Sequence, residues 1–307
     1  MISAEILAIL AALCYAINSV ISASVREKVD VLTFTLLQVG IGAVMTGTLA
    51  LALGGWATIR PEHLLPLALS GAFGVLVTAL SLTGSIFILG ARLPAVLFCL
   101  NTPFAVILGY VFLGEALTAM QLVGAAIVVA GIVIAVLFGA ERRSSGAAPS
   151  SALAAVNLPA SGVHAAAGVA LSVLAALGQA VGSLFARPAM AAMADPFAAT
   201  SVRTATAVLL LAAYAMLRRG ALMRFSASPG PVLFAAASKA FFGVVLGMSL
   251  LLAALSRGDV GLVSTLSSLA PVLVLPLIWI AARKAPRWEA WVGALVAVAG
   301  AGLVMGG

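Results

Sequence analysis

Residues 121–134, QLVGAAIVVAGIVI, decide the class of fold, because this stretch contains no charged residue. It lies in an apolar segment that we expect to run from 118 to 138, and a helix needs roughly 20 residues to cross the hydrocarbon core of a membrane. The whole chain has this character: hydrophobic residues make up 64% of its 307 residues and charged residues 8%. A soluble domain carries about 25% charged residues, so the sequence predicts an integral membrane protein.

Charged residues, prolines and glycines divide the chain into ten predicted transmembrane spans. Backbone groups in lipid must be paired within their own segment, so we expect every span to be a helix; the alternation typical of a closed barrel is absent from the sequence. The predicted spans are 3–25, 31–53, 65–89, 93–113 and 118–138, followed by 163–186, 196–217, 230–256, 259–281 and 287–305. The predicted fold class is therefore an all-α membrane protein.

The stretch 139–162, GAERRSSGAAPSSALAAVNLPASG, is predicted to be a flexible linker because it is rich in Ser, Ala, Pro and Gly. It separates two halves, 1–138 and 163–307, that repeat each other. Matching pairs at offsets of 165 to 169 residues are Asp30 and Asp195, Gln38 and Arg203, Ser81 and Ser249, Gly90 and Gly258, Pro103 and Pro271, Gly124 and Gly293, and Gly131 and Gly300. Each half has five spans, an odd number, so we expect the halves to insert in opposite orientations, as the inverted repeats of secondary transporters do.

The distribution of Lys and Arg predicts how the chain sits in the membrane. The odd-numbered loops and the linker contain eleven of these residues, and the even-numbered loops contain three, Arg60, Arg187 and Arg257. Positive residues gather on the cytoplasmic side, so we expect the odd loops there and both termini outside. The net charge of +7 comes from these dispersed clusters, which does not favour a nucleic-acid partner. We expect a multi-pass protein of a bacterial-type inner membrane.

The sequence resembles the EamA-type branch of the drug/metabolite transporter superfamily over nearly its whole length. In the first half, LNTPFAVILGYVFLGE (100–115), the stretch 121–134 and the polar residues from Tyr15 to Ser19 carry the resemblance. In the second half, DPFAATSVR (195–203), LSSLAPVLVLPLIW (266–279) and WVGALVAVAG (291–300) carry it. The sequence departs from the family pattern at Gln38, where Arg is usual, and at 281–284, where Ala-Ala-Arg-Lys replaces the LGE of the first half.

The resemblance implies two five-helix bundles around a central cavity that work by alternating access. The aromatic and other amino-acid exporters of the family are similar in function. We therefore expect a small-molecule substrate, an amino acid or a related metabolite, moved outward across the membrane. The loops other than the linker are short and the internal repeat already supplies a complete transporter, so we expect no obligate protein partner, and we expect no cofactor.

The acidic residues bear on the mechanism of transport. All nine lie at the ends of predicted spans or in loops. A proton-coupled antiporter normally carries its proton on a carboxylate inside the membrane, where a charged residue is a functional candidate by default. The sequence therefore favours uniport or exchange, although a carboxylate at the end of a span could still reach the cavity.

Two cations, Arg203 and Lys239, lie inside predicted spans. A charge at the centre of a membrane costs at least roughly 2.5–3.5 kcal/mol, so each needs a partner or a water-filled cavity. One hypothesis is an anion site for a substrate carboxylate or phosphate. The other is that the side chain snorkels to the interface or pairs with a helix C-terminus. For Arg203 we favour the second, because the family often has Arg at this helix boundary; for Lys239 both stay open.

Uncharged polar residues inside the spans are candidates for lining the cavity, and the alternative for each is a hydrogen bond between helices. Asn101 is the strongest of them, because it stands two residues before Pro103, which removes a helical hydrogen bond to Cys99 and would expose the carbonyl of Cys99. Pro271 is expected to kink its span in the same way, and both prolines are candidate gating positions. The full set of candidate substrate-binding residues is Tyr15, Asn18, Ser19, Gln38, Asn101, Gln179, Arg203, Lys239, Ser267 and Ser268.

Other functions are less well supported by the sequence. His63 and His164 are too isolated to predict a metal site, and a Gly-rich loop with a Lys, which would bind nucleotide phosphates, is absent from the sequence. A proton-coupled exporter of other metabolites or drugs is one alternative. A membrane enzyme acting on lipid-linked substrates is another, but it would need a cluster of acids and bases that the sequence does not contain. We therefore expect no catalytic residues.

Overall fold

The computed structural model of the chain describes residues 3–23, 31–89, 92–138, 163–217, 229–282 and 288–306, so the predicted linker, 139–162, lies outside the described residues. Regular structure within these ranges is helical throughout. The first half contains α1 (Ala4–Ala23), α2 (Val31–Ala52), η1 (Gly55–Thr58), α3 (Pro61–Gly71), η2 (Ala72–Val77), α4 (Thr78–Leu89), α5 (Arg92–Phe98), α6 (Asn101–Leu108), η3 (Gly109–Leu113) and α7 (Ala119–Phe138). The second half contains α8 (Val163–Ala191), α9 (Pro196–Leu217), α10 (Pro229–Lys239), η4 (Ala240–Met248), α11 (Ser249–Leu255), α12 (Val260–Ser267), α13 (Ala270–Ala282) and α14 (Trp288–Gly306).

The prediction of an all-α membrane protein is confirmed. Within the described ranges, nine helices are long and apolar enough to cross a membrane, and the first predicted span corresponds to the shorter apolar stretch Ala4–Asn18. Large apolar side chains cover the outside of the bundle, among them Leu217, which is 84% exposed, and Phe234, which is 76% exposed. A soluble protein does not expose so many large apolar residues, whereas lipid solvates them.

Two predicted span boundaries were wrong, because each helix continues past its apolar part. The third segment begins at Pro61 instead of 65, with the polar residues Glu62 and His63 in its first turn. The sixth segment, α8, ends at Ala191 instead of 186 and includes Pro188. Arg187, which was counted as a loop residue, therefore lies in α8. Polar and charged residues are tolerated there because a helix end can extend beyond the hydrocarbon.

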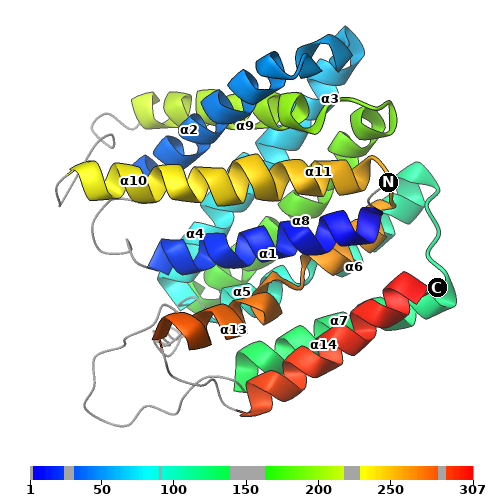
Figure 1. Ribbon diagram of the computed structural model, residues 1–307. Coiled ribbons are helices and arrows are strands. Elements are labelled where there is room, and N and C mark those ends of the chain that lie inside the picture. Colours follow the sequence, from blue (N-terminus) through cyan, green and yellow to red (C-terminus); the bar gives the residue numbers. More distant parts are fainter. Residues whose placement is uncertain are drawn as a thin grey trace.

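The helices run back and forth across the bundle, and both termini lie at the same end of it (Figure 1). A chain that crosses the bundle an even number of times ends on the side where it began. The halves pack against each other through matching pairs of helices: α7 lies beside α14, and α2 lies beside α9 (Figure 1). Likewise, α1 packs on η4 and α11 of the second half, while α8 packs on η2 and α4 of the first half.

The repeated glycines bring α7 and α14 into backbone contact. A Cβ on Gly124 would lie 2.8 Å from the carbonyl oxygen of Gly300, and a Cβ on Gly131 would lie 2.7 Å from the carbonyl oxygen of Gly293. Gly124 is related by the repeat to Gly293, and Gly131 to Gly300, so each glycine contacts the counterpart of the other. This exchange of contacts is what a two-fold relation between antiparallel helices produces. Small residues at such a crossing allow the helices to approach closely.

Of the three π-helical segments in the described ranges, η2 and η4 follow the same repeat, whereas η3 corresponds to part of the α-helix α13. The segments η2 and η4 begin at Ala72 and Ala240, which are 168 residues apart, the offset that also relates Pro103 to Pro271. A π-helix is rare and is frequently found at functional sites. The segments η2 and η4 lie in the middle of their spans, where each packs against helices of the opposite half.

The crossing of α7 and α14 predicts a difference between two glycines of one helix. In Gly293→Ala the new methyl group overlaps the backbone of Ala135, so we expect the variant to lose about 1–3 kcal/mol of stability. In Gly302→Ala the methyl group meets nothing within 4 Å, so the higher helix propensity of Ala should leave the stability unchanged or raise it by about 0.5–1 kcal/mol. Thermal unfolding of the two purified variants in detergent measures the difference. Equal melting of the two would contradict the close contact.

Candidate functional site

The fourth and ninth transmembrane segments are each broken in the middle. Cys99 and Leu100 separate α5 from α6, and Ser268 and Leu269 separate α12 from α13. Pro103 and Pro271 lie in the first turn of the helix that follows each break. A proline is tolerated in a first turn because the N–H that it lacks would have no helical acceptor there. The two breaks therefore occupy equivalent places in the two halves.

The breaks meet across the boundary between the halves. Thr102 Oγ1 and Ser268 Oγ are 3.1 Å apart, and the Ser268 hydroxyl also donates to the carbonyl oxygen of Ser264 at 2.7 Å. A serine has one hydroxyl proton, so Thr102 is the donor to Ser268. This hydrogen bond joins the first turn of α6 to the end of α12.

One prediction about the first break was wrong. The carbonyl of Cys99 is not left for a ligand, because it accepts the backbone N–H of Thr102 at 3.1 Å. The chain tightens into a turn at the break, and a backbone donor three residues later replaces the one that Pro103 cannot supply. Ser267 is also engaged locally, since its hydroxyl donates to the carbonyl of Ser264 at 3.1 Å.

Asn101 begins α6 and is 5% exposed. Its Oδ1 atom is buried and has no hydrogen-bond partner. A buried amide oxygen without a donor is costly, so this atom is available to a ligand that brings an N–H or O–H group. The structure thus places the strongest candidate from the sequence at the break, with an acceptor that the protein itself does not use.

Tyr15 and Asn18 lie three residues apart on α1, so they face the same direction. Their neighbours are glycines of η4: a Cβ on Gly247 would lie 2.8 Å from Tyr15 Cε1, and a Cβ on Gly243 would lie 2.8 Å from Asn18 Nδ2. Because these two glycines have no side chain, they leave room for the two polar side chains of α1 from the other half. Ser19 follows in α1, but its side chain lies outside the described residues.

Arg203 is the largest fully buried side chain of the described part of the protein, at 1% exposed. It is the eighth residue of α9, about 10 Å from the start of the helix. The interpretation that Arg203 snorkels to the interface is therefore wrong, because the side chain is covered by protein. Its Nη2 atom would lie 3.0 Å from a Cβ on Gly74 of η2.

Lys239 ends α10 and is partly buried. Its Nζ atom lies 5.1 Å from the centre of the Phe34 ring on α2, which is a cation–π distance. The repeat relates Lys239 to Gly71, and Gly71 packs against the backbone of Arg203. The two cations therefore lie at equivalent contacts between the halves, one on α9 facing the first half and one on α10 facing α2.

An ion-pair cluster that the sequence did not predict joins three segment ends. Arg187 Nε donates to Glu115 Oε1 at 2.9 Å, and Arg187 Nη2 lies 3.9 Å from Asp259 Oδ1. Glu115 Oε2 also accepts the backbone N–H of Val260 at 2.7 Å. Glu115 is the last residue of the LGE motif of the first half. The second half has Ala-Ala-Arg-Lys at 281–284 instead, so the sequence did indicate that the acidic group is present in one half only.

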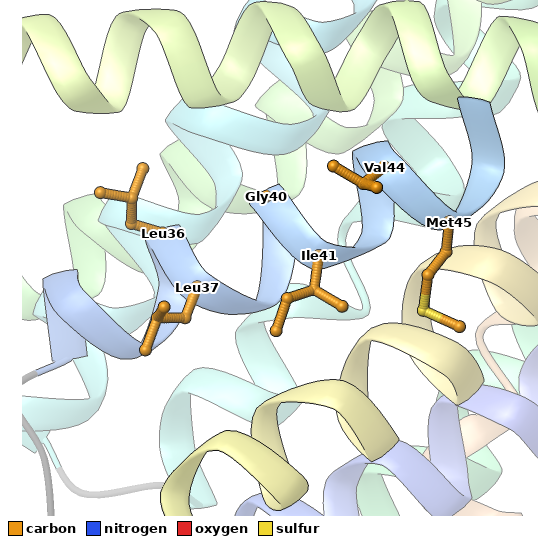
Figure 2. Close-up of a pocket in the computed structure, with 6 residues that line it drawn as sticks. All are labelled: Leu36, Leu37, Gly40, Ile41, Val44 and Met45. Carbon is orange, nitrogen blue, oxygen red and sulfur yellow. The ribbon is translucent and has the colours of Figure 1, made fainter. Parts of the chain in front are cut away.

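Two glutamine candidates and one apolar surface hollow are not part of the contacts described above. Gln38 on α2 and Gln179 on α8 are half-buried. A hollow lies along α2 alone and has six lining residues, Leu36, Leu37, Gly40, Ile41, Val44 and Met45 (Figure 2). None of these residues has a side-chain N–H or O–H group or an oxygen acceptor, whereas a ligand site needs a few polar groups that fix orientation. The polar groups between the halves, and not this hollow, are the candidate site.

The chain matches the model of one protein family and is similar in fold to a solved structure. The model of the EamA-like transporter family matches residues 2–137 and again residues 166–306. A solved structure, titled only as the crystal structure of a protein, matches with a TM-score of 0.77 and 20% sequence identity, covering 98% of this chain and 95% of that one. No curated protein matches. At this identity the solved structure shows the shared fold alone, but the family model covers both halves, and the chain belongs to the EamA-like transporter family.

Proposed function

We propose that the protein is a secondary transporter that exports amino acids or related small metabolites across the inner membrane. The halves, 1–138 and 163–307, act as the two parts of an alternating-access machine. The observation that carries the proposal is the meeting of two broken helices at Thr102 and Ser268. Broken helices at the boundary of inverted repeats are where secondary transporters form their substrate sites.

The positions of the acidic residues support uniport or exchange over proton antiport. Every acidic residue in the described ranges lies between helices or within the first two residues of a helix, for example Glu5, Asp195 and Glu289. Such residues are stabilised by the positive end of the helix dipole. A proton carrier would instead need a carboxylate that alternates between the two sides of the membrane.

The ion-pair cluster supplies a means of closing one end of the path. Glu115, Arg187 and Asp259 connect the segment before α7, the end of α8 and the start of α12, so both halves contribute. Their side chains are 11%, 19% and 41% exposed. By the distribution of Lys and Arg this end faces outward. Opening the path to the outside would separate Glu115 from Arg187.

Transport itself is tested by counterflow. Proteoliposomes are loaded with unlabelled amino acids one at a time, and uptake of the labelled amino acid is followed with and without a pH gradient. We expect a subset of amino acids to stimulate uptake and the pH gradient to have no effect. Uptake driven by the gradient would contradict uniport and exchange. No uptake of any amino acid, in liposomes shown to hold folded protein, would contradict the substrate class.

The closing role of the cluster is tested by thiol accessibility. Cys14 and Cys99 are replaced by Ala, and Thr102→Cys serves as a buried reporter, since Thr102 is 1% exposed. We expect Glu115→Gln to raise the rate at which a membrane-impermeant thiol reagent modifies the reporter, because Gln cannot form the ion pair with Arg187. The matched control is Glu62→Gln, which removes an ion pair with Arg60 that is 3.8 Å long and largely exposed. Equal rates in the two variants would show that the cluster does not close the path.

A further inference from the structure

We propose that Arg203 binds an anionic group of the transported substrate, a carboxylate in the case of an amino acid. This inference rests on the proposed function, because it assumes that the protein carries a substrate through the boundary between the halves. It adds the chemical class of the group that is recognised and the residue that recognises it.

The first argument is that the residues described by the structure do not compensate the charge of Arg203. The Nε and Nη1 atoms of its guanidinium are buried and have no hydrogen-bond partner. Among the described residues no carboxylate forms an ion pair with Arg203, whereas Arg187 of α8 has both Glu115 and Asp259. Burying a charge without a partner is strongly unfavourable, and the usual remedy is a counter-ion with hydrogen bonds. A substrate anion would supply both.

The second argument is the position of the guanidinium between the two halves. Its neighbour in the first half is Gly74 on η2, and it is carried by α9 of the second half. Gly74 is also the residue against which Gly182 of α8 packs, backbone to backbone. A group bound here would contact both halves at once, as the substrate of an alternating-access carrier must.

The third argument is that the backbone contacts of Arg203, among the residues that the structure describes, carry no counter-charge. Gly71 packs against the carbonyl of Arg203, and Gly74 against its Nη2 atom; neither has a side chain. A fixed carboxylate would hold Arg203 permanently. A carrier must instead release its ligand, so an anion that arrives and leaves with the substrate suits this site better.

The stability of two matched variants gives a test that does not depend on transport. In detergent and without substrate, Arg203→Met should raise the melting temperature, because it removes an unpaired buried charge and keeps an apolar side chain of similar length. Arg187→Met, the same substitution at the paired arginine, should lower it. A melting temperature of Arg203→Met that falls as far as that of Arg187→Met would overturn the proposal, because Arg203 would then have a partner within the protein.

Recognition is tested in counterflow with each transported amino acid and its amide, in which the carboxylate is neutralised. We expect the wild type to prefer the acid by at least about tenfold, the value for one charged hydrogen bond. Arg203→Gln should lose this preference, and Arg203→Lys should keep part of it. Equal transport of acids and amides by the wild type, or full preference in Arg203→Gln, would overturn the anion site while leaving the transporter function intact.

Failure of the transporter proposal can be told apart from failure of the anion site. If the wild type carries no compound of the panel, the proposed function fails, and sodium acetate serves as the probe for the site. Acetate should then raise the melting temperature of the wild type more than that of Arg203→Met. An equal response of the two proteins would overturn the anion site as well.

Discussion

A charge inside a membrane protein needs a partner, and the arrangement of this protein follows from how it meets that constraint. The acidic residues that the structure describes lie at the starts of helices or between them, where helix dipoles and cations stabilise them. Arg187, near the end of α8, is held by Glu115 and Asp259. Arg203 is the exception: it is buried, central, and has two guanidinium nitrogens without partners. Because the other charges named here are paired or lie at helix ends, a buried Arg203 indicates a functional role for its charge.

The two-fold relation between the halves explains where the polar groups at the two helix breaks come together. The glycines at the crossing of α7 and α14, the π-helical segments η2 and η4, and the breaks at Pro103 and Pro271 all follow one repeat. Antiparallel halves bring equivalent elements face to face, so the breaks meet at Thr102 and Ser268. Some equivalent positions carry different residues: Arg203 corresponds to Gln38, and Lys239 corresponds to Gly71. The two sides of the boundary between the halves therefore differ in charge.

Much of this could be predicted from the sequence, because apolar length and spacing are local properties. The spans, the repeat and the places of Pro103 and Pro271 are of this kind. The errors concern contacts between helices. Burial excludes snorkelling of Arg203, one part of the favoured interpretation, because depth along a helix does not show whether other helices cover a side chain. The ion pair of Arg187 with Glu115 joins residues 72 positions apart, and the Cys99 carbonyl is paired by a turn that the sequence pattern does not specify.

The central claim is that the missing partner of Arg203 arrives with the substrate, and NMR of ¹⁵N-arginine-labelled protein tests it directly. The Nε–H signal of Arg203 is assigned by its loss in Arg203→Lys. With the substrate that counterflow identifies, the account predicts that this signal shifts on binding, and that the amide of the same compound leaves it in place. An unchanged Arg203 signal at a substrate concentration that saturates counterflow would contradict the account.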